Sequence, residues 1–84
     1  MKWTVAWLPT AMAKLAALWT DGPDRAAITA AANRIDLALK RSPLAVGESR
    51  TGAMRLLLET PLAVKYDVSP ADRLVTVWAV WRTR

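Results

Sequence analysis

The C-terminal half of the chain contains three strand-like segments with very short connections, and this spacing restricts the fold more than any other feature. Residues 53–59, 62–68 and 73–82 are rich in β-branched and other apolar residues. The connections between them, 60–61 and 69–72, each carry a proline. Connections this short join antiparallel neighbours, because a parallel crossover needs about a dozen residues or more. These segments are therefore predicted to form two successive β-hairpins.

The N-terminal half begins with a further strand pattern and then changes to helical spacing. Large apolar residues alternate with smaller or polar ones over 2–7, which is the period of a strand. Residues 10–19 and 23–41 instead place apolar side chains three and four positions apart, as an amphipathic helix does. Gly22 ends the first of these patterns, so a helical hairpin is predicted.

The resulting order, βααβββ, predicts an α+β fold. The first strand must join the other three across the helices, which gives a helical hairpin packed on one face of a four-stranded, mainly antiparallel sheet. The 84 residues are enough for one domain, 1–84. A domain of this size buries only about 60 to 65% of its unfolded surface, so we expect a thin core that a partner completes.

The composition excludes several classes of chemistry. The chain has no Cys and no His, which excludes disulfides, a thiolate nucleophile, an imidazole base and an ordinary zinc or haem site. No metal or cofactor is expected, and any reaction must use Arg, Lys, Tyr, carboxylates or hydroxyls. The net charge of +5 suits a polyanionic partner, but the cations are scattered along the sequence and form no single basic stripe.

Targeting segments are not predicted. The uncharged run 3–13 ends in an A-x-A pattern, but Thr and Pro residues interrupt it, and it is shorter than the roughly 15 to 30 residues of a secretory signal. No stretch approaches the ~20 apolar residues that span a bilayer. We therefore expect a cytoplasmic protein that does not enter membranes.

Five short motifs follow one another along the chain. They are WTVAWLP at 3–9, PL at 43–44, GESR at 47–50, PLAVKYDV at 61–68 and DRLV at 72–75. With the order βααβββ, this set resembles the RelE/ParE superfamily of bacterial toxins, which includes plasmid stabilisation proteins and toxins of type II toxin-antitoxin modules. The resemblance implies a growth-inhibiting toxin held in a hetero-oligomer by a cognate antitoxin that blocks its active surface.

The resemblance leaves the target open, because RelE-like members cut messenger RNA on the ribosome whereas ParE-like members poison DNA gyrase. RelE-like catalytic sets combine Arg and Lys on the central strands with an Arg and a Tyr near the C-terminus. By that resemblance, Arg55 and Arg82 are candidate catalytic residues. Arg50, Lys65 and Arg84 are candidate contacts to nucleic acid or another target.

Strand alternation bears on these candidates. Met54, Leu56 and Leu58 share one face of their strand and are the predicted core set, which places Arg55 on the opposite face, away from the helices. Lys65 on the next strand is predicted to lie on the same uncovered side of the sheet.

Two departures from the family pattern concern catalysis. The third-strand position that usually carries an Arg is occupied by Ala63, and no Tyr follows the last strand. These departures favour gyrase-type or diverged action over ribosome-dependent RNA cleavage, and they leave open whether the protein is an enzyme.

Two apolar residues are predicted to contact the antitoxin. Leu37 lies off the helical stripe formed by Ile28, Ile35 and Leu39. Trp81 belongs to a last strand that is apolar on both faces, so alternation alone does not decide which face is buried. A partner over the outer face, a homodimer or a central position in the sheet each accounts for that strand.

Simpler interpretations stand beside these. Arg55 and Arg82 are equally compatible with solvated strand positions that pair with Glu59 or Asp67. Tyr66 alternates with core residues and is expected to be buried. For the whole chain, the alternatives are a non-catalytic basic module that binds nucleic acid or protein, and a degenerate toxin retained for autoregulation.

Overall fold

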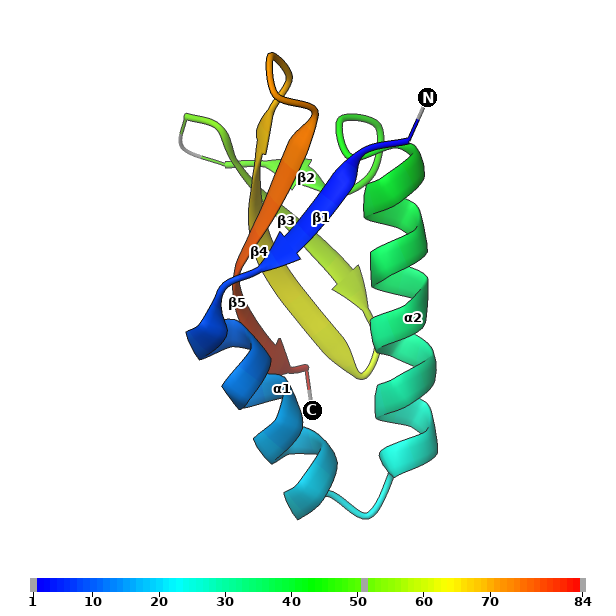
Figure 1. The fold of residues 1–84 in the computed structure, drawn as a ribbon. Helices are drawn as coiled ribbons and strands as arrows, with labels where there is room; N and C mark the ends of the chain where they lie inside the picture. Colours follow the sequence, from blue (N-terminus) through cyan, green and yellow to red (C-terminus); the bar gives the residue numbers. More distant parts are fainter. Residues whose placement is uncertain (1, 51, 84) are drawn as a thin grey trace.

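The computed structural model of the protein describes residues 2–50 and 52–83. Its elements are β1 (Thr4–Trp7), α1 (Pro9–Asp21), α2 (Arg25–Arg41), β2 (Glu48–Ser49), β3 (Met54–Glu59), β4 (Leu62–Ser69) and β5 (Leu74–Arg82). The strands lie in the order β1-β5-β4-β3-β2. β1 runs parallel to β5, and the other neighbours are antiparallel. Figure 1 shows the twisted sheet with the two helices packed against it.

The predicted α+β class and element order are confirmed, with one short addition. β2 is a two-residue strand where no strand was predicted, so the described sheet has five strands. Ser49 pairs with Arg55 and Glu48 with Leu56, which places β2 at the edge beside β3.

The helix boundaries follow from the residues at their ends. Pro9 occupies the first turn of α1, where its missing N–H would have no helical partner, so the helix begins one residue before the predicted pattern 10–19. Gly22 follows the end of α1. In the last turns of α2, Asp36 and Lys40 form the ion pair that their i, i+4 spacing predicts, at 2.8 Å.

The core lies between the helices and the central strands. α2 supplies a buried stripe at helical spacing, and the strands supply alternate residues. The largest fully buried side chains in these elements are Ile28, Ile35, Leu39, Leu62, Val64, Tyr66, Val75 and Val77. The predicted burial of Tyr66 and of the α2 stripe is confirmed.

The predicted facing of β3 is wrong. Leu57 is 8% exposed and opposes Val64 in the core, whereas Leu58 is 61% exposed. Arg55 therefore lies on the helix-covered side, opposite Tyr66. The error arises because this face carries a charged residue at each end, Arg55 and Glu59, with one leucine between them.

A β-bulge in β5 explains why alternation failed there. Val77 pairs with Tyr66 but Ala79 pairs with Lys65, so Trp78 is the extra residue. The bulge shifts the alternation by one position. Val75 and Val77 face the core before it, and Val80 does so after it. Neither of the two alternating sets considered for this strand is therefore buried along its whole length.

Candidate functional site

The side of the sheet opposite the core carries mainly apolar residues from three neighbouring strands, and two of them, Leu58 and Trp78, are exposed. We call this surface the open face; it comprises Leu56, Leu58, Ala63, Lys65, Trp78, Ala79 and Trp81. Trp78 is 46% exposed, although tryptophan has the largest apolar area of any side chain. Large apolar side chains left in water on one face of a sheet are typical of an interaction surface.

Lys65 lies at the centre of the open face. It pairs with Leu56 on one side and with Ala79 on the other, and it is exposed. In the described part of the chain no carboxylate forms an ion pair with it. Two positions along the strand, Ala63 is fully buried between its cross-strand neighbours Leu58 and Trp81. The small, buried side chain at position 63 is thus flanked by two large apolar ones.

Hollows border the open face on both sides. One, of about 400 Å³, is lined by Gly47, Glu48, Arg50, Leu56 and Leu58. Another, of about 330 Å³, is lined by residues of the first turns of α1 together with residues 78–81. The open face is therefore flanked by hollows as well as being mainly apolar.

Arg55 is part of a buried polar arrangement on the helix-covered side. Its Nη2 donates to the carbonyl oxygens of Val46 and Gly47, at 3.2 and 3.4 Å. Its Nε is buried without a hydrogen-bond partner among the described residues. These contacts hold the loop between α2 and β2. The expectation that Arg55 points away from the helices is therefore wrong.

The hydroxyl group of Tyr66 holds the same loop. Its hydroxyl lies 2.9 Å from the carbonyl oxygen of Pro43 and 2.8 Å from that of Val46, so its one proton is shared between two acceptors. Burial raises the pKa of Tyr66, and the nearby Arg55 guanidinium partly offsets this. At neutral pH the hydroxyl is therefore a protonated structural donor.

Gly47 makes this close packing feasible. Its φ is +73°, and a Cβ there would lie 2.7 Å from the carbonyl oxygen of Leu56 and 2.8 Å from the Tyr66 hydroxyl. Any side chain would displace one of these groups. The glycine of the GESR motif is thus explained by packing.

Arg82 is bound to the turn between the two helices. Its Nη1 and Nη2 donate to the two carboxylate oxygens of Asp24, at 2.8 and 3.1 Å. These hydrogen bonds raise the pKa of Arg82, and desolvation of the guanidinium partly opposes this. The guanidinium also packs so closely on Gly22 that a Cβ at this glycine would collide with it. Arg82 thus pairs with Asp24, and neither Glu59 nor Asp67 is its partner.

The other predicted site residues are dispersed. Arg50 forms an exposed ion pair with Glu48 at 3.1 Å. Leu37 is 53% exposed on α2, away from the core. Trp81 lies on the open face, and Arg84 lies outside the described residues.

The three candidate cations of the strands do not converge. Arg55 and Arg82 lie on the helix-covered side, whereas Lys65 lies on the open face. Arg55 is opposite Tyr66 and Arg82 is opposite Leu62, so along β4 they are separated by four residues, or about 13 Å. Alternation missed this separation because it placed Arg55 on the wrong face. Alternation also assigned Leu58 to the core. Only its pairing register with β4 shows that Leu58 is exposed.

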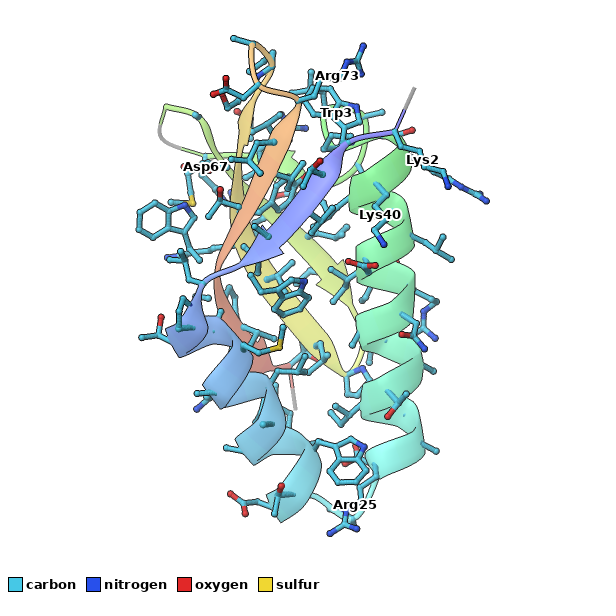
Figure 2. The ribbon with its side chains drawn as sticks, in the orientation of Figure 1. Lys2, Trp3, Arg25, Lys40, Asp67 and Arg73 are labelled. Carbon is cyan, nitrogen blue, oxygen red and sulfur yellow. The ribbon has the colours of Figure 1, made fainter. Side chains whose placement is uncertain are left out.

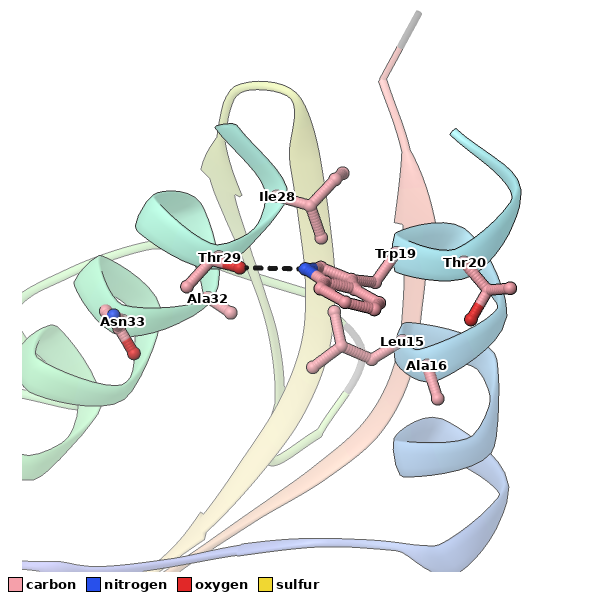
Figure 3. Close-up of a pocket in the computed structure, with 8 residues that line it drawn as sticks. All are labelled: Leu15, Ala16, Trp19, Thr20, Ile28, Thr29, Ala32 and Asn33. Atoms are coloured by element: carbon pink, nitrogen blue, oxygen red, sulfur yellow. Dashed lines mark hydrogen bonds between the residues drawn. The ribbon is translucent and has the colours of Figure 1, made fainter. Parts of the chain in front are cut away.

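A second apolar surface lies between the helices. A groove of about 490 Å³ is lined by Leu15, Ala16, Trp19, Thr20, Ile28, Thr29, Ala32 and Asn33 (Figure 3). The indole N–H of Trp19 donates to Oγ1 of Thr29 at 3.0 Å, and the Arg25 guanidinium stacks 4.6 Å from the ring centre. These contacts hold the Trp19 ring between the two helices (Figure 3).

Neither described helix combines the length and hydropathy needed to cross a membrane. Within residues 2–50 and 52–83, no three acidic residues lie close enough together to hold a metal ion.

Comparison with known proteins identifies the fold. No protein-family model and no curated protein matches the sequence. The structure is similar to a chain of the toxin-antitoxin complex RelBE2 from Mycobacterium tuberculosis, with a TM-score of 0.77 and 21% identity over 98% of this chain and 99% of that one. It is also similar to a chain of the chromosomal ParDE system from P. aeruginosa, with a TM-score of 0.73 and 20% identity over 98% and 97%. The protein therefore shares the fold of chains in RelBE and ParDE toxin-antitoxin complexes, which confirms the RelE/ParE resemblance at the level of the fold.

Proposed function

We propose that the protein is the toxin of a type II toxin-antitoxin module, acts in the cytoplasm and is neutralised by a cognate antitoxin. The fold supports this because nearly the whole chain superimposes on chains from two such complexes. The observation that carries the proposal is the open face, where Leu58 and Trp78 remain in water on a domain with a thin core. A partner over this face would complete the burial that the chain alone leaves unfinished.

The antitoxin is proposed to cover two surfaces. One is the open face, with Trp81 in contact, and the other is the helical hairpin, where Leu37 and the groove beside Trp19 are accessible. A segment that reaches both must be long and partly extended, which suits a chain that folds as it binds.

Binding to a protein target such as DNA gyrase is the proposed mode, in preference to RNA cleavage. Cleavage requires a base for the ribose hydroxyl and cations that converge on one phosphate. Here Arg55 holds a loop, Arg82 holds Asp24, and Lys65 lies on the opposite side of the sheet. Tyr66 is buried and hydrogen-bonded to backbone carbonyls, so it is not positioned as an acid or base.

Controlled expression in a bacterial host tests the toxin assignment. Expression alone should arrest growth, and co-expression with the protein encoded next to it should restore growth. Trp78→Ala and Lys65→Gln should relieve the arrest, whereas Arg34→Gln, an equal change of charge on α2, should not. Unimpaired growth with the wild-type protein verified as soluble and abundant would refute the assignment.

The mode is tested separately. Gyrase poisoning predicts a DNA damage response in arrested cells and inhibition of supercoiling by the purified protein. Translation-dependent cleavage of messenger RNA, lost in Arg55→Ala and Arg82→Ala variants that still fold, would instead establish the RelE-like mode with those two residues as its catalytic groups.

A further inference from the structure

Three segments that are distant in the sequence meet around Trp3. The backbone N–H of Trp3 donates to the carbonyl oxygen of Lys40 in the last turn of α2, at 3.0 Å. The next residue, Thr4, donates to the carbonyl oxygen of Arg73 in the β4–β5 turn, at 2.9 Å. The Arg73 guanidinium lies over the Trp3 ring, 5.1 Å from its centre. Figure 2 shows Lys2, Trp3 and Arg73 at this end of the molecule, with Lys40 further along α2.

Cations from three separate parts of the sequence lie at this junction. We call it the basic end; its charged members are Lys2, Lys40, Arg41 and Arg73, of which all but Lys40 are exposed. Lys40 is paired with Asp36, and Asp72 accepts a hydrogen bond from Ser69. In the described part of the chain, Lys2, Arg41 and Arg73 form no ion pair. This end thus holds four cations and two carboxylates, those of Asp36 and Asp72, which leaves a local positive excess that no run in the sequence indicates.

Helix capping accounts for only part of this cluster. Cations in the last turn of α2 complement the helix dipole, which is a sufficient reason for Lys40 and Arg41. Lys2 and Arg73 come from other segments, and Arg73 reaches the cluster from a backbone with φ of +50°. Non-glycine residues seldom adopt this conformation, so the turn holds Arg73 against Trp3 at some conformational cost.

We propose that the basic end binds the sugar-phosphate backbone of nucleic acid. A guanidinium stacked on an aromatic ring keeps its in-plane N–H donors for phosphate oxygens. Each exposed cation that neutralises a phosphate also releases a condensed counterion, whereas an exposed cation gains little from a single protein carboxylate. The basic end has no groove-reading element, so recognition is of the backbone and not of base sequence. This activity is separate from the proposed toxin function and uses none of the open face.

Binding to two labelled probes tests this inference: a short duplex DNA and an RNA hairpin of similar length, each measured by fluorescence anisotropy over a range of salt concentrations. The triple variant Lys2→Gln, Arg41→Gln, Arg73→Gln should reduce the slope of log affinity against log salt by about 2 to 3, and affinity near 0.1 M salt by on the order of 100-fold. Whichever probe binds more tightly identifies the nucleic acid.

A matched control separates this site from net charge. The triple variant Lys14→Gln, Arg25→Gln, Arg34→Gln removes the same charge elsewhere and should keep most of the affinity and the slope. If thermal denaturation shows that loss of Arg73 unfolds the first triple variant, the pair Lys2→Gln, Arg41→Gln alters no described contact and should still lower the slope by about 2. Equal losses in the two triple variants, or no binding of either probe at low salt, would overturn the proposal, and the growth assay would be unaffected by either result.

Discussion

The two faces of the sheet use similar apolar residues for different purposes. Leu57 and Leu58 are neighbours on β3, yet one is packed beneath the helices and the other is exposed. The cations divide in the same way. On the helix-covered side Arg55 and Arg82 are bound to carbonyls and to Asp24, whereas Lys65 on the open face has no described acidic partner. The covered face stabilises the fold, and the open face remains available for binding.

Truncation of the two leucines is the strongest test of this difference. Leu57→Ala should lower the free energy of unfolding by about 2 to 5 kcal/mol, because it leaves a cavity in the core. Leu58→Ala should change it by only about 0.5 kcal/mol. Urea denaturation measures both. Similar losses for the two variants would show that the open face also contributes to the stability of the isolated chain.

Loss of the buried Tyr66 hydroxyl should have the next largest effect on the free energy of unfolding. Tyr66→Phe removes the donor shared by Pro43 and Val46 and leaves two carbonyls without it, which should cost about 1 to 2 kcal/mol in urea denaturation. Amide hydrogen exchange should accelerate in the loop between α2 and β2, while exchange in β4 and β5 changes less. Uniform acceleration throughout the sheet would mean that the hydroxyl does not act on the loop in particular.

The same hydroxyl gives a pH dependence with a defined sign. Because the folded pKa of Tyr66 is raised above 10.0, the folded state keeps a proton that the unfolded state loses, so stability falls as pH rises past that value. Urea midpoints at about pH 9 and about pH 11 should differ more for the wild type than for Tyr66→Phe. Tyr66 is the only tyrosine, so tyrosinate absorbance reports its pKa directly.

Loss of the carboxylate at the helical turn should have a smaller effect. Asp24→Asn weakens the two hydrogen bonds to Arg82 and should lower the melting temperature by less than Tyr66→Phe does. Combining it with Arg82→Gln should cost less than the sum of the two single changes, because both remove the same interaction. Additive losses would indicate that each residue acts through other contacts.

The open-face lysine should matter least for stability and most for function. Lys65→Gln should change the free energy of unfolding by no more than about 0.5 kcal/mol, yet it should relieve growth arrest. A variant that folds normally and remains fully toxic would remove Lys65 from the proposed target surface.

The elements of this fold could be predicted from the sequence because each has a local cause. Short proline-bearing turns require hairpins, and the Gly22-Pro23 pair separates the helices. β2 was missed because two residues carry no periodicity. The candidate site was harder to predict because the side-chain period of a strand is two, so one residue of register decides between core and solvent.

Arg55, Trp78 and Arg82 show how the pairing register determines the side of the sheet on which a side chain lies. The sequence identifies Arg55 as a strand cation, but only its pairing opposite Tyr66 shows that it serves a loop. Trp78 looks like an ordinary strand residue until the bulge is seen, and the bulge is also what turns Arg82 toward Asp24. The partner of Arg82 lies 58 residues away in sequence, beyond the reach of any local pattern.

The position of β5 has a consequence for the synthesis of the protein. β5 lies between β1 and β4, so the first strand to leave the ribosome must wait for the last before it has a neighbour. Until then, Val75, Val77 and Val80 are missing from the core and Trp78 and Trp81 from the open face. A chain whose translation stops before β5 therefore has neither a closed core nor a complete open face. The topology thus delays both surfaces until β5 has been synthesised.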